Sequence, residues 1–257
     1  MRVVIKIGTS TLTHAGGRLN IRRTEELCKV IADLKNAGLE VIVVSSGAIA
    51  MGVGKMSLAK RPDDVPTKQA LAAVGQCELM YIYDQQFSRY NHAVGQILIT
   101  AADINDADRY RNFSVTLERL LELGVIPIIN ENDTIATEEI VIGDNDTLGA
   151  RVAIAAKADM LVLLSDIEGL YTADPHVDAT AELVREVRDV DDVEALAGGA
   201  GTARGTGGMV TKLVAARMCM EAGCDMVIAN GANPALLYDV VAGRPVGTRF
   251  VAKKAGA

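Results

Sequence analysis

The chain opens with Val3-Val4-Ile5-Lys6-Ile7-Gly8-Thr9-Ser10-Thr11, an apolar run that ends in a glycine and three hydroxyl residues. Apolar side chains at consecutive positions predict a strand that is buried on both faces, as in a parallel sheet between helices. Lys6 is costly inside such a strand unless its ammonium group meets an anion. The glycine allows a tight turn whose backbone N–H groups suit phosphate oxygens. The segment therefore predicts a buried strand and a candidate anion site, with a lysine that reaches past the sheet into solvent as the alternative.

The same pattern recurs along most of the chain, where short β-branched runs alternate with longer helical patterns. Further strands are predicted at 41–44, 96–99, 125–129, 161–164 and 226–228, and helices at 24–35, 68–87, 112–123, 145–156 and 210–221. Three helices are followed by a glycine (Gly38, Gly124 and Gly223), the residue that most readily closes a helix in the left-handed conformation. This alternation predicts βαβ units and a mainly parallel sheet covered by helices.

Composition and charge limit the class of protein. The 257 residues are 49% hydrophobic and 23% charged, which excludes disorder for most of the chain. A net charge of −7 disfavours nucleic acid and anionic membranes as partners. No apolar run approaches the roughly 20 residues of a membrane span, and Met1-Arg2 leads directly into a strand instead of a signal peptide. We expect one cytoplasmic folding unit over residues 1–257, with buried free thiols at the four cysteines, Cys28, Cys77, Cys219 and Cys224.

The familiar nucleotide and metal motifs are missing from the sequence. Gly54-Lys55 lacks the first glycine of a Walker loop, and Gly52-Val53-Gly54 does not follow a strand as a dinucleotide fingerprint does. The three histidines, His14, His92 and His176, are far apart in the chain. We therefore expect neither a zinc site nor a histidine-based triad, and no metal bound by protein ligands alone.

Two segments beyond the first strand favour anion binding. Ser45-Ser46-Gly47 marks a switch from strand to helix, where backbone N–H groups and the helix dipole favour negative charge. Helix capping by a serine is the alternative. Residues 206–212, Thr-Gly-Gly-Met-Val-Thr-Lys, run into a helix and put Lys212 on its first turn, near solvent. A flexible surface loop is the alternative for this segment. Ser165-Asp166 closes another strand, at the edge where a nucleotide binds in open sheets.

Carboxylates and amides gather after the strand at 125–129. Asn130-Glu131-Asn132-Asp133-Thr134 follows this strand directly, and Gly143-Asp144-Asn145-Asp146 follows a predicted hairpin at 134–142. Such a set can orient a substrate ammonium and carboxylate, hold Mg²⁺ or tie lysines in place. An Asx-rich turn explains one of these clusters but not easily both. The two clusters thus predict a polar binding site near the rim of the sheet.

Together these segments resemble the amino acid kinase family, in family order and over almost the whole chain. The resemblance is carried by residues 6–10, 45–49, 72–76, 130–133, 143–146, 169–175 and 206–212. The asparagine-rich clusters and the segment at 206–212 are similar to the members that phosphorylate glutamate. Many members continue into a C-terminal PUA domain, whereas this sequence ends at Ala257. The resemblance therefore implies a single kinase domain of the short form, without that module.

The resemblance also implies a fold and an activity. The fold is a three-layer αβα sandwich with a mainly parallel open sheet, with glutamate over the N-terminal half and ATP over the C-terminal half. The activity is ATP-dependent phosphorylation of the γ-carboxylate of L-glutamate to L-glutamyl 5-phosphate, the first step of proline biosynthesis. Mg²⁺ is carried on the phosphates. A carboxylate is already ionised at pH 7, so the reaction needs no general base.

Individual residues receive roles from the same resemblance. The catalytic set is Lys6, Asp146 and Lys212, in which the two lysines bind phosphate and the aspartate organises them. The substrate contacts are Ser46, Gly47, Asp133 and Asn145, with Asp133 toward the ammonium and Asn145 toward the carboxylate end. The ATP site comprises Lys6, Gly8, Ser165, Asp166, Thr206, Gly207, Gly208, Met209 and Lys212, with backbone N–H groups near Gly8 and Gly47 on the phosphates.

The expected partners are small molecules and other proteins. L-Proline is expected to inhibit as the end product, because it keeps the α-carboxylate and a charged nitrogen but has no γ-carboxylate to phosphorylate. A homodimer or homotetramer and a glutamyl phosphate reductase partner are also implied. Two other functions stay open: a sibling kinase that acts on another carboxylate or on a phosphate, and an amino-acid sensor that binds without catalysis.

Overall fold

A computed structural model describes residues 1–136, 145–175, 177–197 and 208–253, and it contains one eight-stranded sheet in the order β3-β4-β2-β1-β5-β7-β8-β6. All neighbouring strands are parallel except β7 and β8, which are antiparallel. The strands are β1 Arg2–Ile7, β2 Glu40–Val44, β3 Val94–Ile99, β4 Ile126–Glu131, β5 Met160–Ser165, β6 Glu186–Val187, β7 Asp225–Asn230 and β8 Thr248–Phe250. The mainly parallel sheet predicted from the sequence is confirmed.

The predicted strands are found, and two short ones were missed. The run that opens the chain forms β1, which lies between β2 and β5 and is buried from Val3 to Ile7. β6 and β8 have only two and three residues, too few to show a hydrophobic pattern. β3 lies at one end of the sheet, and its Gln96 is exposed, so this strand is not buried on both faces as predicted. An edge strand lacks one neighbour, which leaves part of its surface to solvent.

Helices cover both faces of the sheet. Their bounds are α1 Thr9–Leu12, α2 Ile21–Asn36, α3 Ala48–Lys55, α4 Val65–Ser88, α5 Ala101–Asn105, α6 Ala107–Glu122, α8 Asp146–Ala155, α9 Glu194–Ala197, α10 Met209–Glu221 and α11 Leu236–Val241, with a 3₁₀ turn at Asp191–Val193. Gly38, Gly124 and Gly223 follow α2, α6 and α10 with φ of 94°, 72° and 80°, as helix-closing glycines do. α6 begins five residues earlier than the predicted 112, because Asp106 caps it by accepting from the N–H groups of Asp108 and Arg109.

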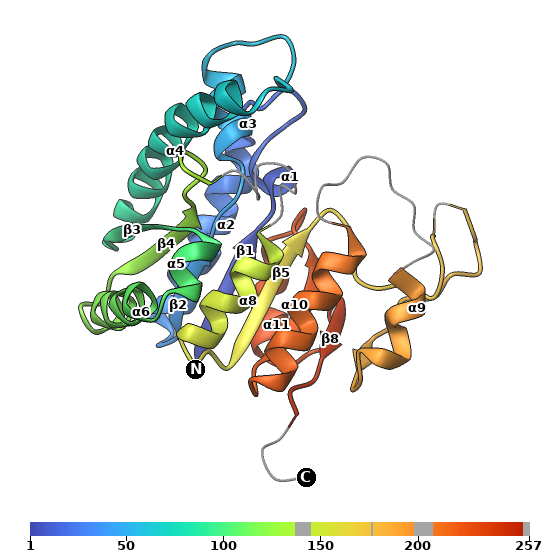
Figure 1. Cartoon of the computed structure of the whole chain (residues 1–257). Coiled ribbons are helices and arrows are strands. Elements are labelled where there is room, and N and C mark those ends of the chain that lie inside the picture. Colours follow the sequence, from blue (N-terminus) through green and yellow to red (C-terminus); the bar gives the residue numbers. More distant parts are fainter. Residues whose placement is uncertain (137–144, 176, 198–207, 254–257) are drawn as a thin grey trace.

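Two apolar cores lie on opposite faces of the sheet, which makes the fold a three-layer αβα sandwich (Figure 1). Alternate residues of β1 divide between them, since Val3, Ile5 and Ile7 face α2, α3, α4 and α11. Val4 faces α6, α8 and α10 instead. Side chains alternate along a strand, so Lys6 lies on the same face as Val4. The fold therefore brings Lys6 to the face that α8 and α10 cover.

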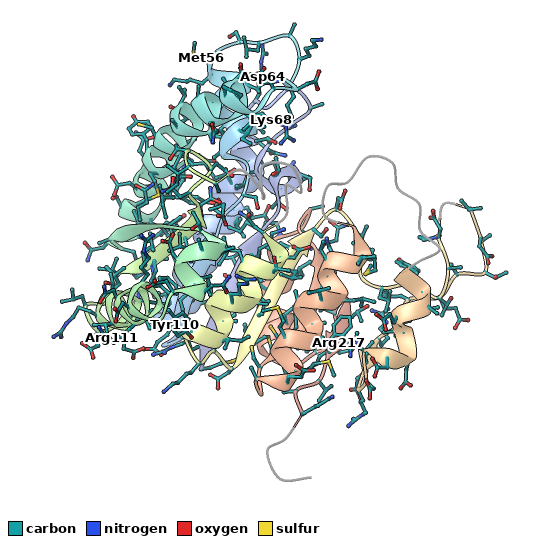
Figure 2. All side chains as sticks on the ribbon, in the orientation of Figure 1. Met56, Asp64, Lys68, Tyr110, Arg111 and Arg217 are labelled. Carbon is teal, nitrogen blue, oxygen red and sulfur yellow. The ribbon has the colours of Figure 1, made fainter. Side chains whose placement is uncertain are left out.

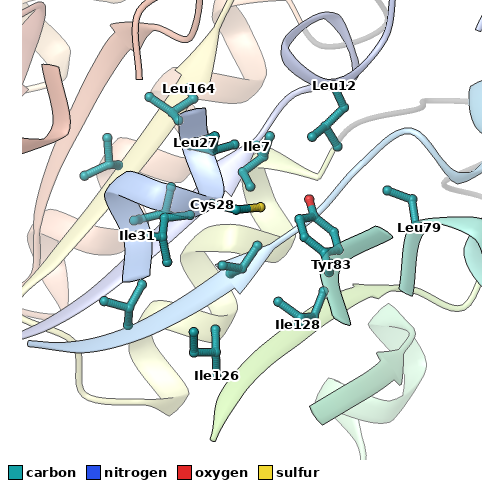
Figure 3. Close-up of a cluster of buried hydrophobic side chains, with 14 of the residues drawn as sticks. Ile7, Leu12, Leu27, Cys28, Ile31, Leu79, Tyr83, Ile126, Ile128 and Leu164 are labelled. Atoms are coloured by element: carbon teal, nitrogen blue, oxygen red, sulfur yellow. The ribbon is translucent and has the colours of Figure 1, made fainter. Parts of the chain in front are cut away.

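The core under α2 and α4 is well packed and carries one polar anchor (Figure 3). Tyr83 and Phe87 of α4 are fully buried and stack with ring centroids 6.2 Å apart. The hydroxyl of Tyr83 forms a hydrogen bond of 2.9 Å with Ser45 Oγ. Cys28 is also buried here, and burial raises its thiol pKa, whereas Cys77 is exposed, contrary to the expectation that all four thiols are buried. Charged side chains lie at the periphery, among them Arg111 of α6 and Asp64 before α4 (Figure 2).

Most of the predicted hairpin falls in an undescribed range, and the described ranges hold no candidate for a membrane-spanning helix. The predicted hairpin lies outside the described residues from position 137 on, and Thr134 and Ile135 form a turn. Among the residues that the structure describes, no helix combines the length and apolar character needed to cross a membrane.

The packing of α3 on α4 leads to a test of stability. A Cβ added at Gly75 would lie 1.8 Å from the carbonyl oxygen of Ala48, so the two backbones leave no room for a side chain. In an open helix, Gly→Ala stabilises by about 0.8–1 kcal/mol. We expect the opposite here: Gly75→Ala should lower the free energy of unfolding by about 1–3 kcal/mol through overpacking.

Chemical denaturation checks this prediction, with Val74→Ala as the control. Val74 is the preceding residue of α4 and its side chain is 38% exposed, so its truncation should change the unfolding free energy little. An unchanged or raised stability of Gly75→Ala would show that the contact between α3 and α4 adjusts without cost.

Candidate active site

One buried carboxylate joins two lysines from distant parts of the chain. Lys6 Nζ lies 2.6 Å from Asp146 Oδ1, and Lys212 Nζ lies 2.9 Å from Asp146 Oδ2. Lys6 comes from the carboxyl end of β1, Asp146 is the first residue of α8, and Lys212 lies in the first turn of α10. The three residues are 7%, 0% and 5% exposed. The structure thus places the predicted catalytic set in direct contact.

The lysines decide the charge state of the aspartate. Burial alone would raise the pKa of Asp146, but the attraction and hydrogen bonds of Lys6 and Lys212 outweigh it and lower the pKa to about 2. The first turn of α8 also favours an anion, because the positive end of the helix dipole lies there. With two ammonium groups on one carboxylate, the cluster has a net charge of +1 and favours an additional anion beside it.

α8 and α10 both pack closely around this cluster. A Cβ added at Gly149, one turn along α8, would lie 3.4 Å from Lys6 Cβ, so α8 packs closely over the aliphatic part of that lysine. α10 begins after Gly208, and Thr211 Oγ1 donates to the Gly208 carbonyl at 2.8 Å. Lys212 is buried, contrary to the expectation that it lies near solvent, because α8 packs beside α10 at this point.

The switch from β2 to α3 supplies a second wall of the site. Gly47 is the N-cap residue of α3 with φ of 93°, a left-handed conformation that disfavours other residues. Neither serine caps the helix: Ser45 is buried and bonds to Tyr83, and Gly47 holds the N-cap position without a side-chain bond. Ser46 and Gly47 are half-buried, beside the ends of β1 and β2. The capping alternative for these serines is therefore excluded.

Three amide side chains continue the site from β2 toward β4. Asn145, the residue before α8, donates from Nδ2 to the carbonyl of Ser45 at 2.7 Å and to Asn130 Oδ1 at 2.8 Å. Asn130, at the end of β4, donates in turn to Gln76 Oε1 of α4 at 2.8 Å. Asn130 is 1% exposed and Gln76 is 9% exposed. We call Gln76, Asn130 and Asn145 the amide chain.

The remaining predicted contacts lie along the same edge of the sheet. Asp133 is half-buried in the turn after β4. On the other side of β1, Ser165 ends β5 and its hydroxyl donates to Asp166 at 3.1 Å. The N–H of Gly8 donates to the Leu164 carbonyl at 3.0 Å, so this N–H is used within the sheet and is not available to a phosphate. Gly208 is the N-cap of α10 and Met209 is its first residue, whereas Thr206, Gly207, Gly143 and Asp144 lie outside the described residues.

Two members of the amide chain, Asn130 and Gln76, were not predicted as site residues from the sequence. Asn130 and Gln76 both belong to segments that the resemblance rests on, but neither was assigned a role. Asn130 carried a usable signal, since an amide that directly follows a buried apolar strand must find partners. Gln76 carried no such signal in the sequence, because the pattern of its neighbours predicts an ordinary buried face of a helix. Its partner comes from β4, 54 positions away.

The edge of the sheet thus has a polar, a cationic and a second polar zone in spatial order. Asn130 lies in β4 and Ser45 directly follows β2, Lys6 lies in β1, and Ser165 ends β5. Parallel strands bring all their carboxyl ends to one edge, which is where ligands bind in open α/β sheets. Such an arrangement suits two ligands that meet over the lysines, one on each side of β1. This is the geometry needed for transfer of an anionic group between them.

Comparisons with known proteins agree with this geometry. The sequence profile of the amino acid kinase family matches residues 1–230. Glutamate 5-kinase of Symbiobacterium thermophilum is 53% identical over 249 residues, which cover 97% of this chain and 95% of that protein. Glutamate 5-kinase of Caldanaerobacter subterraneus subsp. tengcongensis is 51% identical and covers 99% of this chain, which spans 68% of that protein.

A solved structure supports the same fold at much lower identity. Carbamate kinase from Giardia lamblia bound to AMP-PNP is 16% identical and superposes with a TM-score of 0.70, covering 98% of both chains. The matched profile spans β1 to β7 and includes Lys6, Asp146 and Lys212. On this evidence, the chain belongs to the amino acid kinase family.

Proposed function

We propose that the chain is an ATP-dependent kinase that phosphorylates the γ-carboxylate of L-glutamate and so carries out the first step of proline biosynthesis. The relatives named glutamate 5-kinase support the substrate, because they are about half identical over nearly the whole chain. The observation that carries the chemistry is the buried Lys6–Asp146–Lys212 cluster with its net positive charge. Kinase membership also means that ATP is the phosphoryl donor.

The reaction needs charge stabilisation more than proton transfer. An oxygen of the γ-carboxylate attacks the γ-phosphorus of ATP, the bond to the β,γ-bridging oxygen breaks, and its electron pair stays on ADP. The products are L-glutamyl 5-phosphate and ADP. Two anions must approach each other, and negative charge develops on the bridging oxygen. Lys6 and Lys212 lie where both charges can be met, with no general base required.

Asp146 acts through the lysines. As an anion it would repel a phosphoryl group, so direct contact with the reacting atoms is unfavourable. Its two oxygens instead bind one ammonium group each, which holds Lys6 and Lys212 at a fixed separation. A preorganised pair of cations stabilises the transition state without the cost of reorganisation during the reaction. Asp146 is therefore a positioning residue in this proposal.

The two halves of the sheet would hold the two substrates. We assign glutamate to the β4 and β2 side, with Ser46, Gly47, Asp133 and Asn145. We assign ATP to the β5 side, with Ser165, Asp166, the residues at 206–209 and the two lysines. No three His, Cys, Asp or Glu side chains in the described ranges come together as a metal site. Mg²⁺ would be held by the phosphates and would neutralise their charge during transfer. A cytoplasmic homodimer or homotetramer that passes its acyl phosphate to a reductase belongs to the same proposal.

Acceptor specificity tests the proposed function. With ATP, Mg²⁺ and hydroxylamine, L-glutamate should give a hydroxamate, because an acyl phosphate reacts with hydroxylamine. Acetylglutamate, aspartate, carbamate and UMP should not support turnover above the level without an acceptor. ADP formation measured in parallel detects phosphate acceptors that give no hydroxamate. Turnover with one of these acceptors instead of glutamate would assign the chain to a sibling kinase, and binding of glutamate without turnover would favour the sensor.

Asp146→Asn tests the role of the buried carboxylate. The substitution keeps the shape but weakens the hold on both lysines, so kcat should fall by roughly 10²–10⁴-fold while the KM for glutamate changes little. A large rise in KM with a normal kcat would make Asp146 a substrate contact and would contradict the proposed role. Steady-state kinetics with both substrates varied separates the two outcomes.

The lowered pKa of Asp146 predicts that stability depends on pH. Because the folded-state pKa of Asp146 is about 2, against an ordinary value of 3.8, its contribution is complete above about pH 4 and is lost as the pH falls toward 2. The difference in unfolding free energy between wild type and Asp146→Asn should therefore be constant from pH 5 to 8 and shrink by on the order of 2 kcal/mol at lower pH. A difference that stays constant, or grows, as the pH falls through 4 would show that the lysines do not lower this pKa.

Asp133→Asn tests whether proline shares the glutamate site. Loss of the carboxylate should raise the KM for glutamate and the inhibitory concentration of L-proline together, by about 10–150-fold for one charge-assisted bond. Asp84→Asn removes an exposed carboxylate of α4 and is the control that should change neither. Unchanged proline inhibition beside a collapsed affinity for glutamate would place the inhibitor at a separate site.

A further inference from the structure

We propose that the amide chain turns Asn145 into a pure hydrogen-bond acceptor, so that it selects the free α-ammonium group of the acceptor substrate. In this proposal Asn145 contacts the substrate, and Gln76 and Asn130 are positioning residues that act through it. The inference rests on the proposed function, and it reverses the expectation that Asn145 binds the carboxylate end of glutamate.

Two backbone groups fix that direction. The N–H of Glu131 donates to Asn130 Oδ1 at 2.9 Å, and an N–H cannot accept. The carbonyl of Ser45 receives a bond of 2.7 Å from Asn145, and a carbonyl cannot donate. The amide of Asn130 must therefore face Glu131 with its oxygen, and the amide of Asn145 must face Ser45 with its nitrogen. A flip of either amide would place two donors or two acceptors together.

The bonds between these ends complete the assignment. Asn130 Oδ1 also accepts from Asn145 Nδ2 at 2.8 Å, and Asn130 Nδ2 donates to Gln76 Oε1 at 2.8 Å. An amide nitrogen has two N–H groups, and both of those on Asn145 are used by Ser45 and Asn130. Only Asn145 Oδ1 is left for a ligand, and none of the described residues donates to it.

An amide oxygen distinguishes the two charged groups at the α-carbon of an amino acid. It accepts a hydrogen bond from an ammonium group, whereas it repels a carboxylate. Asn145 also precedes Asp146 directly, so its side chain lies next to the lysine cluster and on the same side as Ser45. A substrate whose α-nitrogen is acylated, or that lacks this nitrogen, would lose the bond.

Gln76 matters because it is the last link and is buried. Without its oxygen, the N–H of Asn130 Nδ2 loses an acceptor inside the protein, which favours rotation of Asn130 away from Asn145. Asn145 would then regain a free N–H and with it the ability to bind a carboxylate. A purely structural amide chain, which only ties α4, β4 and α8 together, would instead change stability without changing which ligands bind.

Two analogues of glutamate separate the ends of the substrate. Glutarate lacks the α-ammonium group, and 4-aminobutyrate lacks the α-carboxylate. We expect Asn145→Ala to weaken L-glutamate and 4-aminobutyrate by about 10–150-fold each and to change glutarate less than twofold, with dissociation constants measured by titration calorimetry. Asn145 makes no capping bond to α8, so alanine removes no helix cap. The reverse pattern, with glutarate weakened and 4-aminobutyrate unchanged, would overturn the proposal.

Variants of Gln76 test the positioning role. Gln76→Met removes the acceptor at similar volume and should lower the preference for glutamate over glutarate by roughly 2–10-fold, whereas Gln76→Glu keeps an acceptor for Asn130 and should restore the preference. Gln85→Met is the matched control, because Gln85 is exposed on the same helix. A preference that stays at the wild-type value in Gln76→Met, beside a lowered melting temperature, would reduce the chain to a structural role.

Binding and turnover are read separately in this design. Suppose that wild type binds the three ligands and that Asn145→Ala weakens L-glutamate and 4-aminobutyrate but not glutarate. If no hydroxamate forms, the proposed function then fails and the inference stands. If hydroxamate forms and the pattern is reversed or absent, the inference fails and the proposed function stands. Wild type that binds none of the three ligands would overturn the inference as well.

Discussion

The contact of Asp146 with Lys6 and Lys212 is the constraint on which the rest of the structure depends. Taking three charged groups out of water costs several kcal/mol for each one unless their partners lie at hydrogen-bonding distance. β1 must therefore be central, and α8 and α10 must both begin over the face to which Lys6 points. Removing the carboxylate would leave two ammonium groups buried side by side. The position of β1 and the starts of α8 and α10 together make this contact.

Close approaches of the backbone give the site its shape. α8 packs on the stem of Lys6 at Gly149, and Gly75 and Gly52 let α4 pack on α3, whose N-cap is Gly47. The same packing brings Gln76, next to Gly75, within reach of Asn130. A site built from strand ends and helix starts is rigid, so its polar groups hold their directions before any ligand binds. Preorganisation of this kind suits a reaction whose main barrier is the repulsion of two anions.

Local patterns in the sequence predicted most of the architecture. Runs of apolar residues gave the six longer strands, and glycines gave the ends of α2, α6 and α10, because these signals arise from neighbouring residues alone. The motifs at Lys6, Ser46, Asn145 and Lys212 were found because amides, hydroxyls and lysines are unusual directly beside buried strands or at helix starts. β6 and β8 were missed, since two or three residues carry no pattern of their own and pair only because the sheet is already formed.

The sequence by itself determined the class of fold, the family and the residue types at the site. Only the tertiary structure decided what those groups are free to do. The N–H of Gly8 donates to the Leu164 carbonyl, and Lys212 is buried by neighbouring helices. Both N–H groups of Asn145 donate to partners, one to the Ser45 carbonyl and one to Asn130 Oδ1. The physical reason is that the hydrogen-bonding capacity left to a residue depends on its partners in space. Asn145 and Ser45 are 100 positions apart, and Lys6 and Asp146 are 140 apart.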